Sequence, residues 1–213
     1  STVLIQQLTT RLNNAFSLKQ PGHLDYFLGI EVKYLFNNSI LMIQSKYIGD
    51  LLHKTHMAEA HSISSPMVSN CKLSWHGADA FHDPTLFRSV VGALQYVTRP
   101  ELSFAVNKVC QFMAAPLDSH WAVVKRILGY LKGTLSDGLL FQPTNINQPV
   151  VLHAFCDADW ASDVDDRRST SGAAVFLGPN LISWWSRKQK VTSRSSTEAE
   201  YRSLAQTSAK LAW

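Results

Sequence analysis

Apolar residues recur every three or four positions along much of the chain, which is the spacing of one helical face. Residues 2–17 and 45–57 each carry one such stripe. The same spacing covers most of residues 83–133, and it returns from about Thr197 to the end. The pattern therefore predicts helices in all four places.

The stretch 83–133 is expected to hold three helices that pack on one another. Asp83-Pro84 predicts the first start, because Asp caps a helix and Pro fits its first turn. Arg99-Pro100 predicts a break, since the residue before a proline avoids helical geometry. The third helix is expected to begin near Asp118 and to end at Gly133.

Short apolar runs predict a hairpin near the N-terminus. Residues 25–35 and 40–45 are the two expected strands. Asn37-Asn38-Ser39 lies between them and supplies residues that tolerate a positive φ. The polar stretch 61–82 has neither pattern and is predicted to be a linker.

Three further strands and a helix are expected in the last third of the chain. The strand at 150–157 is predicted to be buried, and Gly178-Pro179-Asn180 separates the next two, at 172–177 and 181–186. With the helix from Thr197, these segments make a β-β-β-α unit, so a mixed fold is expected.

Composition excludes several classes of protein. The 213 residues are 46% hydrophobic and 17% charged, with a net charge of +4, which does not fit a disordered tail. No stretch approaches the roughly 18 apolar residues of a membrane span. The three cysteines form no CxxC pair, so a reducing compartment is expected. The apolar pattern continues to Trp213 without a stop signal, which suggests a fragment.

Five aspartates lie close together, beginning with the last residue of the predicted strand at 150–157. Such carboxylates repel one another unless cations or solvent screen them, and Mg²⁺ prefers oxygen ligands of this kind. The alternative is a solvated acidic loop, with Arg167 and Arg168 as counter-charges. Asp157 is the best placed metal ligand, because a strand aims it. The five are Asp157, Asp159, Asp163, Asp165 and Asp166.

The last helix opens with two glutamates. A capping box would use Ser195 with Glu198 or Thr197 with Glu200, and it would leave the other glutamate for a site. The two glutamates point about 200° apart. Glu200 lies one turn before Leu204 and is therefore the expected inward member.

A basic run follows the predicted strand at 181–186, beside Trp184 and Trp185. Basic groups with neighbouring aromatic rings suit a nucleic-acid backbone. A basic edge strand that resists pairing with other chains is the alternative. With Trp185, the run gives the candidate nucleic-acid contacts Arg187, Lys188, Lys190 and Arg194.

The sequence resembles the Pol polyprotein of copia-type long-terminal-repeat retrotransposons over essentially its whole length. The resemblance rests on ordered strings, among them DYFLGIEV (25–32), FRSVVGALQY (87–96), HWAVVKRILGYLKGT (120–134), CDADWASDVDDRRSTSGAAVFLG (156–178) and SSTEAEYRSLA (195–205).

The resemblance implies an α/β (α+β) fold with parts of two domains. The hairpin would resemble the one that grips the primer terminus, with Leu28 and Gly29 approaching the nucleic acid. The implied parts are the C-terminal end of reverse transcriptase (1–60), a linker (61–82), a helical connection (83–134) and a truncated ribonuclease H-like domain (150–213).

The resemblance also implies a chemistry. Asp157 and Glu200 would be the catalytic carboxylates and would bind Mg²⁺ for two-metal hydrolysis of the RNA strand in an RNA–DNA hybrid. The implied partners are this hybrid, primer-template nucleic acid and the rest of the Pol polyprotein, with no membrane. The parent would act in the cytoplasm, in a virus-like particle, or in the nucleus.

The chain departs from the family pattern in ways that affect activity. The polymerase's Tyr-Val-Asp-Asp string and the nuclease's third and fourth carboxylates are absent, and the spacing around Thr98 is about two residues short, which suggests decay or a shifted boundary. The fragment alone is therefore expected to lack polymerase activity and most nuclease activity. The alternatives are a non-catalytic nucleic-acid-binding remnant and a translated relic without function.

Overall fold

The structure is a computed structural model that describes residues 2–16, 23–69, 71–77, 79–144 and 149–212. These residues form six α-helices and two antiparallel sheets, which confirms the expected mixed α+β class. Trp213 lies outside the described residues. No helix of the described part is long and apolar enough to cross a membrane.

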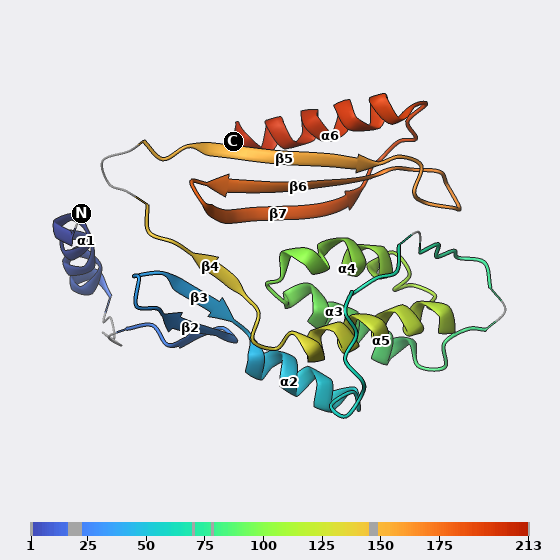
Figure 1. Ribbon diagram of the computed structural model, residues 1–213, viewed down its shortest axis with the longest axis horizontal. Helices are drawn as coiled ribbons and strands as arrows, with labels where there is room; N and C mark the ends of the chain where they lie inside the picture. The colour runs from blue at the N-terminus through green and yellow to red at the C-terminus, as the bar shows by residue number, and fades with distance from the viewer. Residues whose placement is uncertain (1, 17–22, 70, 78, 145–148, 213) are drawn as a thin grey trace.

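A helical body forms the main hydrophobic core (Figure 1). α3 begins as predicted, because the Asp83 side chain accepts a hydrogen bond of 2.8 Å from the backbone N–H of Leu86. Buried residues of four helices, α2 to α5, meet in this core. The helices are α2 (Ser45–Lys54), α3 (Pro84–Tyr96), α4 (Ser103–Cys110) and α5 (Asp118–Gly133).

The predicted break between α3 and α4 is an ordered turn that hydrogen bonds fix in place. Val97 and Arg99 are extended, and a short 3₁₀ helix, Pro100–Leu102, precedes α4. The guanidinium of Arg99 is 4% exposed and donates hydrogen bonds to the backbone carbonyls of Thr134 and Asp137. Both apolar stripes therefore reach one core despite the short spacing at Thr98.

The first sheet corrects two sequence predictions. The strand expected at 25–35 is two strands, because Leu28 and Gly29 have φ values of +49° and +78° and form a two-residue hairpin turn. The sequence pattern also did not predict the short strand Leu139–Phe141. This strand exists because it pairs with residues 40–42, which lie far away along the chain. The strand order is β1 (Tyr26–Phe27), β2 (Ile30–Tyr34), β3 (Ile40–Ile43), β4 (Leu139–Phe141).

The second sheet holds the predicted β-β-β-α order. Its strands pair as β5 (Leu152–Asp159), β6 (Thr170–Leu177) and β7 (Asn180–Lys188), and α6 (Ser196–Leu211) contacts β5 and β6. The predicted burial of the first strand is wrong, since Phe155 is 65% exposed. The physical reason is that β5 is an edge strand and α6 covers only one face.

The first helix is more exposed, and the predicted linker more buried, than their sequence patterns predict. α1 (Thr2–Ala15) is a helix as predicted, but its apolar residues Leu4 and Leu8 are 66% and 59% exposed. The predicted linker has no helix or strand among its described residues apart from a bridge at Ala80. Leu73 and Phe81 of this segment are nevertheless buried in the helical core. We call residues 61–82 the packed strap, because described residues of this segment pack against the helical core without forming a helix or a strand.

Candidate functional site

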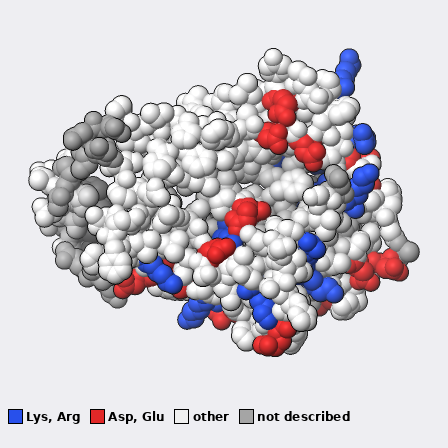
Figure 2. All heavy atoms as spheres, viewed as in Figure 1, with Lys and Arg blue, Asp and Glu red and all other residues white. Residues whose placement is uncertain are grey.

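The two predicted catalytic carboxylates come from neighbouring elements. The hydroxyl of Ser203 on α6 donates a hydrogen bond of 2.9 Å to the carbonyl oxygen of Asp157 on β5. One carboxylate oxygen of Glu200 accepts a hydrogen bond of 3.3 Å from the backbone N–H of Ala158. The structure therefore brings Glu200 to the peptide that follows Asp157. Both acidic residues are exposed, and acidic atoms gather over the end of β5 (Figure 2).

The inward face of α6 was predicted incorrectly. The buried residues are Ala199, Ser203 and Thr207, whereas Leu204 is 50% exposed. Small side chains at this four-residue spacing let the helix approach the sheet closely, which leaves no room there for leucine. Glu200 therefore reaches β5 from the flank of the helix.

The N-terminus of α6 contains one half of the capping box predicted for Ser195 and Glu198, because the Glu198 side chain bonds Arg194 instead of the backbone N–H of Ser195. The Ser195 hydroxyl accepts a hydrogen bond of 3.1 Å from the backbone N–H of Glu198. The Glu198 carboxylate accepts one of 2.7 Å from the backbone N–H of Arg194, and this bond and the Arg202 side chain lower its pKa. Glu198 thus belongs to the helix start, and Glu200 is left to face β5.

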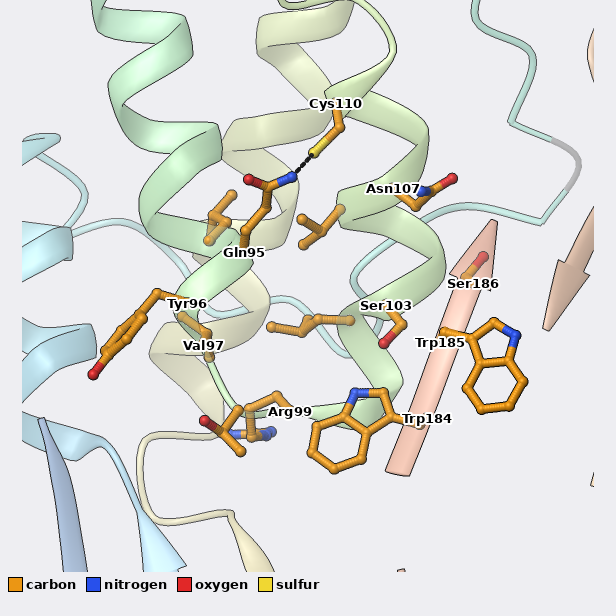
Figure 3. A pocket seen from close by; sticks show the side chains of 14 residues that line it. Gln95, Tyr96, Val97, Arg99, Ser103, Asn107, Cys110, Trp184, Trp185 and Ser186 are labelled. Atoms are coloured by element: carbon orange, nitrogen blue, oxygen red, sulfur yellow. Dashed lines mark hydrogen bonds between the residues drawn. The ribbon is translucent and has the colours of Figure 1, made fainter. Parts of the chain in front are cut away.

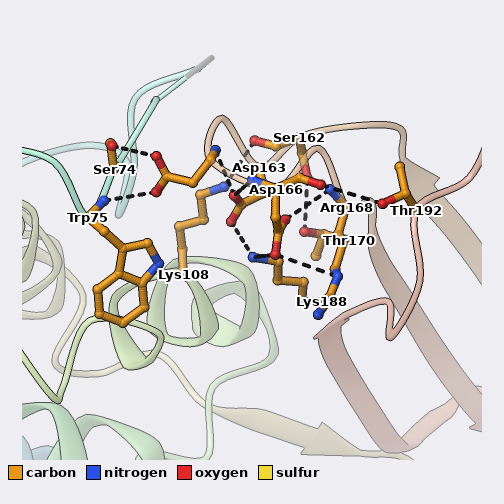
Figure 4. Close-up of polar contacts among 11 residues, drawn as sticks. Ser74, Trp75, Lys108, Ser162, Asp163, Asp166, Arg168, Thr170, Lys188 and Thr192 are labelled. Carbon is orange, nitrogen blue, oxygen red and sulfur yellow. Dashed lines mark hydrogen bonds and ion pairs between the residues drawn. The ribbon is translucent and has the colours of Figure 1, made fainter.

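Most of the aspartate cluster has a structural role. Asp163 is 2% exposed, and its carboxylate accepts hydrogen bonds from the backbone N–H groups of Asp165 and Asp166 (Figure 4). The Lys188 ammonium lies 2.7 Å from the Asp163 carboxylate and 2.8 Å from that of Asp166. Lys188, rather than the expected pair of arginines, is the main counter-charge, with Arg168 3.6 Å from Asp166.

This pairing changes the expected roles in the basic run. Lys188 is 20% exposed and holds the acidic loop, so its charge is largely matched within the chain. Arg187, Lys190 and Arg194 are exposed. A contribution of any of the four to nucleic-acid binding stays a prediction.

Trp185 is half-buried. The Lys210 ammonium of α6 lies 3.8 Å from the centre of the Trp185 ring, which is a cation–π contact. Burial, with help from Arg187, lowers the pKa of Lys210. Trp184 and Trp185 both line a cleft of about 400 Å³ between β7 and the helices α3 and α4 (Figure 3).

Two tyrosines, Tyr47 and Tyr96, contact the Leu28-Gly29 turn. The Tyr96 hydroxyl donates a hydrogen bond to the carbonyl oxygen of Leu28, and the Tyr47 and Tyr96 side chains lie beside Gly29. The Leu28 side chain is 65% exposed. Contact of this exposed turn with nucleic acid stays a prediction.

Sequence reasoning missed Gln189, which connects the sheet to α6. Gln189 is 2% exposed, and its amide nitrogen donates hydrogen bonds of 2.9 Å to the Ser171 hydroxyl and the Ala199 carbonyl. Its amide oxygen accepts one of 3.0 Å from the Ser193 hydroxyl. This network fixes the α6 N-terminus, and hence Glu200, against the sheet. Its position inside a basic run concealed it.

The donor chemistry at Asp157 and Glu200 suits a hard cation, because both supply exposed carboxylate oxygens. Within the described residues, no three or more His, Cys, Asp or Glu side chains gather in a way that could hold a metal ion. The two carboxylates therefore fit Mg²⁺ only as part of a larger ligand set.

Comparison with known proteins gives long matches to transposon polyproteins. The retrovirus-related Pol polyprotein from transposon RE2 of Arabidopsis thaliana is 46% identical over 214 residues, which cover 100% of this chain and 14% of that polyprotein. The one from transposon TNT 1-94 of Nicotiana tabacum is 33% identical over 99% of this chain and 16% of its own length. An uncharacterized mitochondrial protein of Arabidopsis thaliana is 42% identical over 100% of this chain and 88% of its own length.

No family model matches the chain, and no solved structure matches it. The sequence relatives therefore carry the comparison alone. The chain spans only a small part of the polyproteins that it resembles.

Proposed function

Because the chain belongs to the copia-type retrotransposon Pol polyproteins, of which it spans a short segment, we propose that it joins two enzymatic parts of such a polyprotein. Residues 1–60 would complete a reverse transcriptase domain, and residues 150–213 would begin a ribonuclease H domain. The helices between 83 and 134 would connect them. The parent would work in the cytoplasm, in a virus-like particle, or in the nucleus, and the rest of the polyprotein is its proposed partner.

The observation that supports the nuclease part is the contact between Glu200 and the peptide after Asp157. It brings the Glu200 carboxylate of α6 to the backbone of β5 directly after Asp157. Hydrolysis of the RNA strand in an RNA–DNA hybrid would use the carboxylates of these two residues together. Asp157 and Glu200 would hold Mg²⁺ with the phosphate oxygens of the substrate. When bound, Mg²⁺ would activate water and stabilise the leaving oxygen.

The chain's own groups would orient the substrate. The Glu200 oxygen that accepts from Ala158 is fixed, so the other oxygen is free to face the hybrid. Two carboxylates give little metal affinity without further ligands, because Mg²⁺ keeps several waters and needs near-octahedral geometry. We therefore expect the 213-residue chain to bind hybrid with help from Mg²⁺ but to cleave it little or not at all.

The first test measures hybrid affinity of the purified chain with and without Mg²⁺. Asp157→Asn and Glu200→Gln should each abolish the increase in affinity that Mg²⁺ causes, because each removes a charged oxygen ligand. Asp50→Asn and Glu59→Gln are matched controls at exposed positions and should keep it. An unchanged Mg²⁺ effect in both site variants would contradict the nuclease assignment, and cleavage by the wild-type chain would contradict its expected incompleteness.

A non-catalytic nucleic-acid-binding remnant is the second candidate function. Arg187 and Lys190 favour it, since both are exposed beside Trp185. Reversing both charges should weaken hybrid binding and reduce its salt dependence. Binding that is unchanged in affinity and in salt dependence would exclude this surface.

A further inference from the structure

A second cleft lies between α4 and the loop that follows β5. It has a volume of about 420 Å³, and its wall includes residues of the packed strap, of α4 and of the loop. Its charged lining residues are Lys72, Lys108, Arg167 and Asp159. Three cations therefore face one carboxylate, which makes the cleft a net basic site.

Lys108 is the unusual member of this cleft. The residue is 3% exposed, and its ammonium donates a hydrogen bond of 3.2 Å to the carbonyl oxygen of Ser162 (Figure 4). Among the described residues, no carboxylate lies within ion-pair distance of this ammonium, and the nearby Asp163 carboxylate is bound by Lys188. A buried ammonium with one neutral partner is unfavourable, because it keeps donors and a charge that no protein group matches. An anion in the cleft would supply what is missing.

The rim of the cleft can contribute to the same anion. Lys72 and Arg167 are both exposed and line it. Arg167 has a φ of +59°, and its backbone N–H donates a hydrogen bond of 3.1 Å to the Asp163 carbonyl oxygen. This hydrogen bond to the buried Asp163 fixes the backbone of the loop that carries the Arg167 guanidinium.

We propose that this cleft binds a phosphate group of a nucleic-acid backbone, with Lys108 at its base and Lys72 and Arg167 at its rim. The inference rests on the proposed function for its choice of nucleic acid as the source of the phosphate. Asp159 lines the cleft, and Asp157 lies on the same side of β5, two residues or about 7 Å earlier along the strand. A phosphate held here directs the bound strand along β5 toward the candidate catalytic carboxylates.

The test uses the full chain, with inorganic phosphate and an RNA–DNA hybrid as separate probes. Backbone amide NMR signals of residues 104–108 and 161–167 should shift on addition of phosphate. The rim variant Lys72→Ala/Arg167→Ala should lose these shifts, and its log affinity for hybrid should depend on log salt with a slope smaller by about 2. The charge-matched variant Lys54→Ala/Lys125→Ala changes exposed lysines outside the cleft and should keep the shifts and most of the slope.

The outcomes separate the cleft from the proposed function. Phosphate-induced shifts without any hybrid binding would support an anion site for free phosphate and overturn nucleic acid as its source. Equal losses of slope in the rim and control variants would overturn the cleft, because general surface charge would then explain binding. Absence of phosphate shifts in the wild-type chain would overturn it as well.

Discussion

Asp163 and Lys188 form the most deeply placed ion pair of the acidic loop. Burial alone would raise the pKa of Asp163, but the Lys188 ammonium and two backbone N–H groups outweigh it and hold the pKa below its usual value. Burial alone would lower the pKa of Lys188, but the carboxylates of Asp163 and Asp166 outweigh it and raise this pKa. Both shifts indicate that the folded state prefers the charged pair.

Removing the ammonium should therefore destabilise the fold. Lys188→Met leaves Asp163 buried and charged, and we expect a loss of about 2–4 kcal/mol in the free energy of unfolding. Lys190→Met, two residues away and exposed, should cost much less. Urea unfolding at pH 7 measures both, and equal midpoints for the two variants would contradict the structural role of Lys188.

The pH dependence of this loss follows from the lowered pKa of Asp163. A carboxyl whose pKa is lower in the folded state stabilises fully above its unfolded pKa, about 3.9, and less as the pH falls through the folded value. The difference between wild type and Lys188→Met should accordingly shrink below about pH 4.

Side-chain partners of this kind could not be predicted from the sequence. Lys188 was expected to face nucleic acid, but its partner Asp163 lies 25 positions away along the chain. Arg99 was expected only to mark a break, yet its guanidinium organises carbonyls 35 and 38 residues later. Local pattern shows the residue type and not the partner that tertiary folding supplies.

At the level of elements, α6 depends on its cap. The Ser195 hydroxyl satisfies a backbone N–H that would otherwise have no partner in the first turn. Ser195→Ala should therefore lower the free energy of unfolding by about 1 kcal/mol. Thr197→Ala is the control within the same turn and should cost less, since Thr197 is not the cap. Thermal unfolding compares them, and an equal loss in both variants would contradict the assignment of the cap.

Elements with strong local signals were predicted well. Asp83-Pro84 marks the start of α3, and Asn38 supplies the positive φ of the turn between β2 and β3. β4 has only three residues and exists through its pairing with β3, so no local signal could reveal it. Leu28 was unexpected in a turn, because leucine rarely takes a positive φ. For the site, sequence placed Asp157 and Glu200 on the right elements, but not the helix face.

At the scale of the whole molecule, polar ties join the helical body to the unit of β5, β6, β7 and α6. The Asp165 carboxylate accepts hydrogen bonds of 2.5 Å from the Ser74 hydroxyl and 2.8 Å from the backbone N–H of Trp75 (Figure 4). Lys108 adds its bond to the Ser162 carbonyl oxygen. These contacts hold the candidate phosphate cleft and the candidate carboxylates in one frame.

Cutting one tie should separate the stabilities of the two parts. Asp165→Ala removes both hydrogen bonds to the strap, so amides of β6 and α6 should exchange hydrogen faster while those of α3 and α5 change little. Asp79→Ala, at an exposed position of the same strap, should leave both sets unchanged.

The Ser74 hydroxyl and the Trp75 N–H lower the pKa of Asp165, so the tie is complete above the unfolded pKa and weakens as the pH falls through the folded value. Wild type in acid should then approach the exchange pattern of the variant. Uniform acceleration across α3 and α6 would instead show that the chain opens as one cooperative unit.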